Sequence, residues 1–320
     1  MPASSNLRVN QLLTQYTTFL RNNESSFVAD RALPVKEVDS SQGKYYKIDG
    51  GFGFGVDSNF GLRSAGSKFN RDTVNVSQVD LYTCKERGHE RVVDDDEVDE
   101  AAENEHDLKQ TASELAYHNM MLGRELRAAA LLFSATVFSG YTEALNGNDR
   151  WDDDSSKPIQ KTAEWADLVE AQTGVPQEEQ TLLLGADVWR HLSGHSQLLE
   201  SMKYTSGGVG RLDTEAAARI LRFKEIIVGR ALYNSAEENT AGTVTQTRVW
   251  GKYALVYVRR ETPNPLSDHG VGFTAVRRGR LIRTSEYREE PRSNVVLVDT
   301  KEDMVVSTPK AGYLGSTVVS

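Results

Sequence analysis

Hydrophobic and polar positions follow two different periods along this chain, and the period changes near residue 100. Apolar and polar residues alternate in 43–50 and again in 72–86, which predicts two strands on either side of a glycine-rich stretch. From about 100 to 135 apolar residues recur seven positions apart, which predicts a long helix. The chain therefore combines a hairpin with a helix longer than a small domain needs.

The predicted long helix has two apolar rows, one of them with Leu108, Leu115, Leu122 and Ala129 and the other with Ala112, Leu126 and Phe133. At 1.5 Å per residue it would span about 54 Å. The acidic run before it suits the positive end of a helix dipole. Asn119 and Gly123 weaken a coiled-coil interpretation, so the pattern favours a scaffold helix.

The second half of the chain reads as mixed helix and strand. A loop at 146–160 precedes a helix at about 160–172, the buried strand TLLLG at 181–185, and helices at ADVWRHL, SQLLESMKY and DTEAAARILRF, the last with a cap at Asp213 or Thr214. The remaining alternating runs predict strands at about 224–233, 243–250, 253–260, 271–276, 280–287, 293–299 and 303–308.

The N-terminal part predicts a short amphipathic helix within 1–22, followed by a strand or extended arm in SSFVADRALPVKEVDS. Residues 1–22 lack the basic start and apolar core of a secretory signal, and no window is apolar enough to span a membrane. The net charge of −9 argues against a protein that mainly grips nucleic acid, and a single cysteine, Cys84, excludes an intrachain disulfide.

The stretch DGGFGFGVDSNFGLRSAG, residues 49–66, has six glycines and three phenylalanines, and invites a phosphate-loop interpretation. A dinucleotide or kinase loop needs G-x-G-x-x-G, but Gly51 and Gly53 are followed by Val56, and Gly53 and Gly55 by Ser58. The stretch therefore reads as a long flexible hairpin loop.

Other candidate sites are equally weak in the sequence. The acidic runs at 94–100 and 151–156 lack calcium-loop spacing, and His191 and His195 lack the glutamate of a zinc helix. No G-x-S-x-G motif occurs. We expect no catalytic, cofactor-binding or metal-binding residues, and no cofactor.

One basic cluster, RRGRLIR at 277–283, alternates arginines with apolar residues along a predicted strand. Such a cluster suits contact with nucleic acid and also ion pairs with a neighbouring molecule. The net negative charge of the chain favours the ion pairs.

The order of the segments resembles the major capsid proteins of tailed bacteriophages, which have the Hong Kong 97-type fold. VADRALPV, the glycine-rich hairpin, the acidic lead into a long helix, GADVWRHL and RVWGKYALVYV carry the resemblance. It implies an α+β fold with an N-terminal arm at 1–42, an extended hairpin loop at 43–85, a peripheral domain at 86–149 with a spine helix, an axial domain at 150–270, and C-terminal peripheral strands at 271–320.

The resemblance also implies a function and partners. The chain would assemble with itself into hexamers and pentamers of an icosahedral shell, enclosing double-stranded DNA without reading its sequence and contacting no membrane. A separate scaffolding protein, a portal protein and a decoration protein are the other expected partners, and the virion, after assembly in the host cytoplasm, is the expected location.

The expected contacts between subunits come from Phe52, Phe54 and Phe60 of the hairpin and from Arg277, Arg280 and Arg283 of the basic cluster. Two alternatives stay open: an encapsulin-like shell of a cellular nanocompartment, and a nucleotide-dependent enzyme that uses the glycine-rich stretch.

Overall fold

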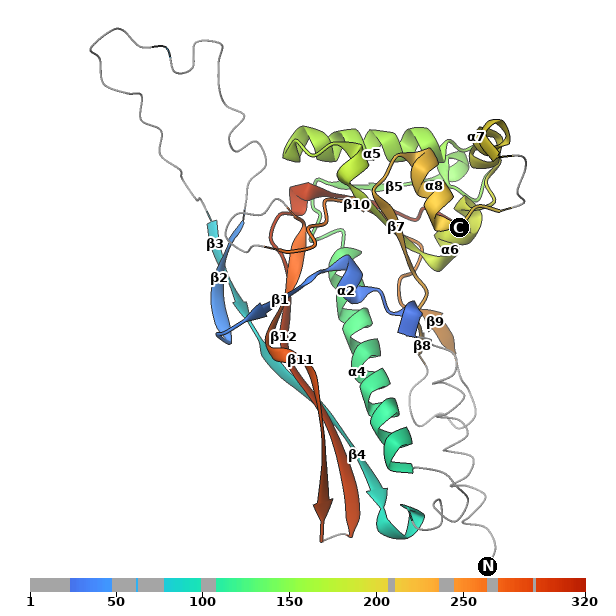
Figure 1. The fold of residues 1–320 in the computed structure, drawn as a ribbon. Coiled ribbons are helices and arrows are strands. Elements are labelled where there is room, and N and C mark those ends of the chain that lie inside the picture. The colour runs from blue at the N-terminus through green and yellow to red at the C-terminus, as the bar shows by residue number, and fades with distance from the viewer. Residues whose placement is uncertain are drawn as a thin grey trace, which may run out of the picture.

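A computed structural model describes residues 24–47, 62, 78–98, 108–206, 211–235, 245–263, 270–289 and 292–320. The long helix α4 (Leu108–Leu132) runs along one sheet in the lower half, and a second sheet with four helices forms the upper half (Figure 1). The helix expected in 1–22 and the first residues of the expected long helix lie outside these ranges.

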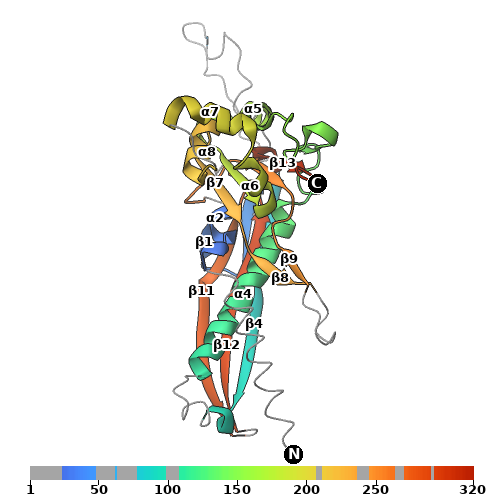
Figure 2. The same ribbon diagram turned by 90° about the vertical axis from the view of Figure 1, so that its right-hand side faces the viewer.

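The lower sheet has four strands in the order β1 (Val35–Val38), β11 (Gly272–Arg288), β12 (Ser293–Val306) and β4 (Lys85–Asp94). β1 is parallel to β11, and the other pairs are antiparallel. Helix α4 covers one face of this sheet, as the turned view shows (Figure 2). The four strands predicted between 271 and 308 are two long ones. The expected break at 277–279 lies within β11, where the pairing with β12 shifts register between Arg277 and Ile282, and the expected break at 300–302 lies within β12, which stays paired with β4 there.

The hairpin is confirmed at its base, where β2 (Gln42–Lys47) pairs antiparallel with β3 (Gln78–Thr83). The strand predicted for 72–86 is divided at Cys84, because β3 pairs with β2 and β4 pairs with β12 of the four-stranded sheet. Tyr45 and Tyr82 both meet Phe273 edge to face, at centroid distances of 6.1 and 6.4 Å, and fix the hairpin base on β11.

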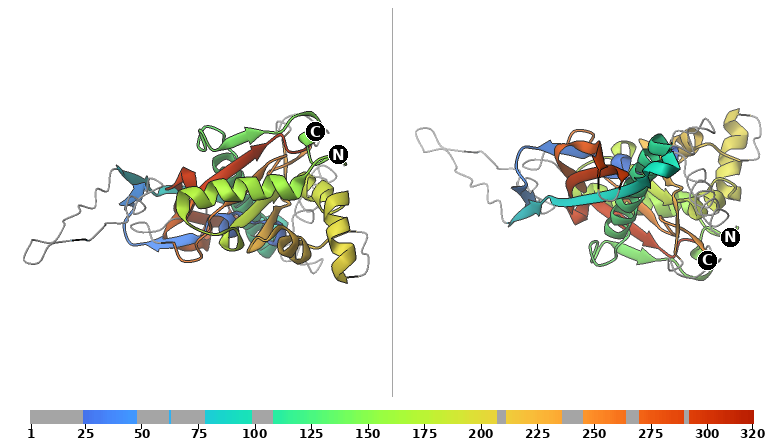
Figure 3. Two further views of the ribbon diagram at one scale, coloured as in Figure 1. Left: turned by 90° about the horizontal axis from the view of Figure 1, so that it is seen from above. Right: turned by 90° about the horizontal axis from the view of Figure 1, so that it is seen from below.

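The upper sheet has five strands in the order β5 (Thr142–Ala144), β13 (Gly312–Ser316), β10 (Ala254–Tyr257), β6 (Thr181–Gly185) and β7 (Glu225–Gly229). The resemblance places every strand after residue 271 beside the long helix, whereas β13 lies in this sheet, between β10 and β5. Seen from above, helix α5 (Pro158–Thr173) lies across the sheet (Figure 3). The strand TLLLG is confirmed, and all five of its residues are buried.

The other helices of the upper half are α6 (Ala186–Leu192), α7 (Ser196–Ser206) and α8 (Thr214–Leu221). The predicted cap of α8 is confirmed, since the Asp213 side chain accepts a hydrogen bond from the Ala216 N–H at 2.9 Å. Two further strands, β8 (Leu232–Asn234) and β9 (Gln246–Arg248), pair antiparallel with each other. The short 3-10 helices are η1 (Glu24–Ser26), η2 (Gly147–Asp149), η3 (Gln177–Glu179) and η4 (Pro309–Ala311).

The arm is not extended throughout. Residues 29–32 form the single helical turn α2 (Ala29–Ala32), and only then does the chain enter β1. The turn is too short to be stable alone, so its conformation depends on the groups around it.

Trp250 connects the two halves of the molecule. Its side chain is fully buried, meets Phe133 after the end of α4 edge to face at 5.3 Å, and lies against the end of β7 at Gly229. A Cβ at Gly229 would come within 2.1 Å of Trp250 Cγ, so only glycine fits under the ring.

We predict that Gly229→Ala lowers the free energy of unfolding by about 2 kcal/mol, because the indole cannot move away from a new methyl group without strain. Urea unfolding followed by near-ultraviolet circular dichroism measures this. The matched control is Gly194→Ala, where the nearest atom to a new Cβ is 4.0 Å away, and it should change little. Equal losses in both variants would contradict the packing argument.

Candidate assembly surfaces and the arm joint

The predicted contact residues fall largely outside the described part of the chain. This holds for Phe52, Phe54 and Phe60. Arg280 and Arg283 belong to β11, but their side chains are not among those described. Arg277 is described, and its Nη1 donates a hydrogen bond to Ser41 Oγ at 2.6 Å, so this arginine already fastens β11 to the segment before β2.

The segment 29–33, here called the arm turn, is held at both ends by side chains from other elements. At its start, Glu125 Oε1 of α4 accepts a hydrogen bond from the Ala29 N–H at 2.5 Å. At its end, Arg259 Nη1, the Tyr257 hydroxyl and the Thr274 hydroxyl donate to the carbonyls of 31, 32 and 33 at 3.2, 3.1 and 3.1 Å. The backbone groups that a short helix leaves unsatisfied are thereby satisfied by α4, β11 and the end of β10.

A row of buried charges lies beside the arm turn. Arg124 is 1% exposed, and its two terminal nitrogens lie 3.2 Å from Asp30 Oδ1 and 3.1 Å from Glu302 Oε2. Arg127 pairs with the other oxygen of Glu302. Arg124 therefore connects the arm, the long helix and β12 through buried ion pairs.

Glu125 also connects the long helix to the upper half. Its Oε2 accepts a hydrogen bond from the Trp250 indole N–H at 2.5 Å, and the side chain is 0% exposed. Burial raises the pKa of Glu125 to about 7, although the amides of 28 and 29 and the indole oppose the shift. One carboxyl group thus touches the arm turn and Trp250 at once.

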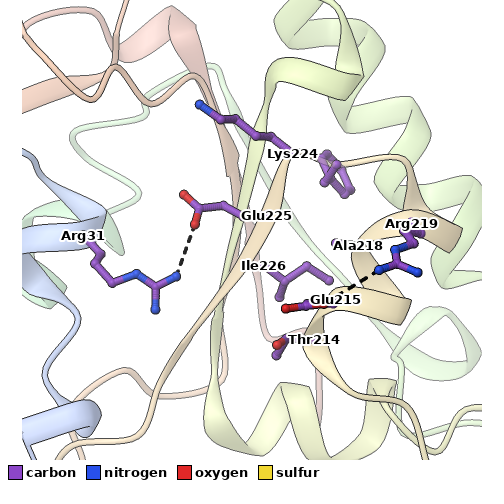
Figure 4. A pocket seen from close by; sticks show the side chains of 9 residues that line it. Arg31, Thr214, Glu215, Ala218, Arg219, Lys224, Glu225 and Ile226 are labelled. Carbon is purple, nitrogen blue, oxygen red and sulfur yellow. Dashed lines mark hydrogen bonds and ion pairs between the residues drawn. The ribbon is translucent and has the colours of Figure 1, made fainter.

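A cleft of about 460 Å³ opens between α8, β7 and the arm turn (Figure 4). Arg31 reaches across it to Glu225 at 3.2 Å, and Arg219 faces Glu215 on the wall formed by α8. Lys224, at the rim, lies 2.9 Å from Glu261. Each of these cations already faces a carboxylate of the same chain. The cleft is therefore a polar surface and not a preformed anion-binding site.

The outer face of the hairpin base has two exposed apolar side chains, both on β3, and Leu81 lies opposite Lys44 of β2. Val79 and Leu81 are 48% and 60% exposed, whereas the alternate residue Tyr82 packs inward against Phe273. Two large apolar side chains exposed on one strand face form a small patch, which is a candidate contact surface.

Ser156, His195 and Cys84 form structural contacts. Ser156 Oγ lies 3.0 Å from His195 Nε2, but His195 Nδ1 accepts from the Gln197 N–H at 3.2 Å. Neutral His195 then carries its proton on Nε2 and cannot act as a base toward Ser156. Burial raises the pKa of the Cys84 thiol, so it stays protonated.

Within the described ranges, no group of three or more histidine, cysteine, aspartate or glutamate side chains could hold a metal ion. The helices in the same ranges include none with the length and apolar character needed to cross a membrane.

Comparison with known proteins gives one family match and several relatives. Residues 139–265 match the family described as phage major capsid protein E. The chain is 26% identical to the major capsid protein of Pseudomonas phage JBD67 over 82% of its length and 81% of that relative. It is 26% identical to the major capsid protein of Burkholderia phage BcepMu over 97% of its length and 96% of that relative.

Solved structures share the fold. A phage-related protein of Bordetella bronchiseptica RB50 matches with a TM-score of 0.71 at 18% identity, over 95% of this chain and 96% of that one. The capsid of cyanophage P-SCSP1u matches with a TM-score of 0.57 at 11% identity, over 89% and 86%. The expected α+β phage capsid fold is confirmed.

Sequence reasoning missed Arg124, Glu125 and Trp250. It also placed Leu126 in an apolar row, whereas that side chain is 36% exposed. The buried face of α4 keeps Ala112, Leu115 and Ala129 of the predicted rows, and its other members are Ala116, His118, Arg124, Glu125, Ala128 and Leu132. The sequence did contain a signal for the buried charges. The row of small and apolar residues from Ala112 to Leu132 recurs at helical spacing and includes Arg124 and Glu125, and charged residues on a buried face need partners.

We predict that Arg124→Met lowers the free energy of unfolding by about 3–5 kcal/mol, because Asp30 and Glu302 lose their common partner in a buried site. Chemical denaturation measures the loss. Arg219→Met is the matched control, since Arg219 and Glu215 are both 82% exposed, and it should leave stability unchanged. Similar stability of the two variants would show that the buried row does not hold the arm.

Proposed function

We propose that this chain assembles with copies of itself, as hexamers and pentamers, into the icosahedral shell that encloses the double-stranded DNA of a tailed phage. The chain is a phage major capsid protein: the family match, the two curated relatives and the shared capsid fold support this together. The observation that carries the proposal is the alignment with the BcepMu major capsid protein over nearly the whole of both chains.

The domain division stays part of the proposal. We assign 1–42 to the arm, 43–85 to the extended loop, 86–149 and most of 271–320 to the peripheral domain, and 150–270 to the axial domain. Because β13 pairs with β10, and β5 (Thr142–Ala144) pairs with β13, we add both strands to the axial domain. Scaffolding, portal and decoration proteins are the partners we infer beyond the chain itself, and the virion, after assembly in the host cytoplasm, is the location.

We propose a structural role without catalysis. The matched family is a structural one, and the tautomer of His195 argues against the one serine–histidine pair described above. The nucleotide-dependent alternative rests on the glycine-rich stretch, which lies outside the described residues. An encapsulin-like shell is less supported, because both curated relatives are phage major capsid proteins.

Assembly tests the proposal directly. The purified chain, expressed with the scaffolding protein of its phage, should form closed shells by electron microscopy, and DNA-filled particles in an infection. A chain that stays monomeric under both conditions would contradict it.

We predict that Leu81→Asp leaves thermal unfolding of the subunit near that of the wild type but abolishes shells, because the exposed face of β3 contributes to subunit contacts and not to the core. Sedimentation velocity and microscopy measure assembly. Leu168→Asp is the matched control, since Leu168 is 49% exposed on a face of α5 that already carries exposed Glu164 and Asp167. Loss of shells in the control, or unfolding of the Leu81 variant, would count against the hairpin surface.

For the basic cluster we predict that Arg280→Glu and Arg283→Glu reduce the yield of shells more than they reduce DNA retention per shell. The physical reason is that a guanidinium fork suits ion pairs with carboxylates of a neighbouring subunit. Particle counts and DNA content per particle measure the two effects. Normal assembly with poor DNA retention would instead favour a surface that faces the genome.

A further inference from the structure

Glu125 is a buried acid that holds two parts of the molecule. It accepts from the Ala29 N–H at the start of the arm turn and from the Trp250 indole N–H, both at 2.5 Å. None of the ion pairs in the described part of the chain includes it. A carboxylate held in this way keeps two hydrogen bonds but loses its hydration without gaining a counter-ion.

The charges around Glu125 explain why it lacks a counter-ion. Arg124 is turned toward Asp30 on the arm and Glu302 on β12, and Arg127 also pairs with Glu302. Arg124 and Arg127 therefore face two other carboxylates, and Arg87 of β4 adds a positive charge beside Arg127. The charged group that acts on Glu125 is Asp30, which repels its ionised form. His118, two turns earlier on α4, faces Phe27 with a centroid distance of 5.1 Å.

We propose that Glu125 is a pH-sensitive latch for the arm turn: the protonated carboxyl keeps residues 29–33 attached, and ionisation favours a state in which they separate from α4 and water reaches Glu125. Attachment also depends on the carbonyl contacts of Tyr257, Arg259 and Thr274, so separation means the loss of an entire turn of chain. The latch belongs to the subunit and does not depend on shell formation.

Proton linkage determines how attachment of the arm turn depends on pH. Burial raises the pKa of Glu125 to about 7 in the attached state, and a carboxyl that water reaches has its ordinary pKa of 4.5. The attached state therefore binds the proton more tightly, its advantage is full at low pH, and it declines as pH rises toward 7. Over that window the ratio of attached to separated chains falls by up to about 300-fold.

Hydrogen exchange on the purified full chain tests this. The amides of Arg31, Ala32 and Leu33 are bonded within the turn, to the carbonyls of 28 and 29. After correction for intrinsic exchange, their protection should fall more than tenfold between about pH 5.5 and pH 8, and Glu125→Gln should remove this fall because the amide does not titrate. Protection that is constant with pH in the wild type, or an equal fall in the glutamine variant, would overturn the proposal.

Glu143→Gln is the matched control, because Glu143 also accepts from an indole, that of Trp165 at 2.9 Å, but has Lys161 as its counter-ion. This variant should keep the pH response. If Glu125→Gln does not fold, carbon-13 NMR of the side-chain carboxyl in the unmodified chain decides the matter: a midpoint near 7 supports the latch, and one below about 5 overturns it. Trp250→Phe, which removes a donor to the ionised form, should move the midpoint upward.

Discussion

The structure depends on how one helical turn of the arm is held by side chains of other elements. A turn of four residues cannot persist in water, because its first amides and its last carbonyls lack partners within the helix and too few bonds remain to offset the cost of ordering it. Here Glu125 takes the first amide, and Arg259, Tyr257 and Thr274 give hydrogen bonds to the last carbonyls. Since these side chains belong to the long helix, the end of β10 and β11, their positions relative to one another are fixed by contacts to the same short piece of chain.

The cost of this arrangement is a set of charges taken out of water. Arg124 and Arg127 balance Asp30 and Glu302, and Glu125 is left over. Apolar residues of similar volume would give comparable or greater stability at such a site. What a charged row adds is selection of one register, because a shift of the arm or of β12 by one residue would leave a buried charge without its partner. Trp250 also selects one arrangement. Its ring fits only over glycine at 229, and in that position its indole N–H donates to Glu125.

The sequence predicted those parts of the fold whose cause is local. The strand at 181–185 is five consecutive buried residues, and α8 begins where Asp213 caps it. Predictions failed where a distant group decides the conformation. The arm turn is helical because of α4 and β11, Cys84 separates two strands because their partners lie in different sheets, and residues 277–282 stay in one strand because β12 continues beside them. The phenylalanine contacts were predicted from the resemblance and the arginine contacts from a basic cluster in an acidic chain, and most of these side chains lie outside those that the structure describes.

The polar groups at the centre of the molecule are used within the chain: the arm turn by its capping side chains, Arg31 by Glu225, and Arg277 by Ser41. The apolar face of β3 differs, because Tyr82 is buried against β11 while Val79 and Leu81 on the opposite face stay exposed. Asp80, next to Tyr82 on the inward face, accepts a hydrogen bond from the Tyr45 hydroxyl, so the chain itself uses one face of β3 and leaves the apolar side chains of the other face exposed. The subunit interior therefore sets the shape of the molecule, and the exposed side chains of Val79 and Leu81 are the basis of the shell contact proposed for the hairpin base.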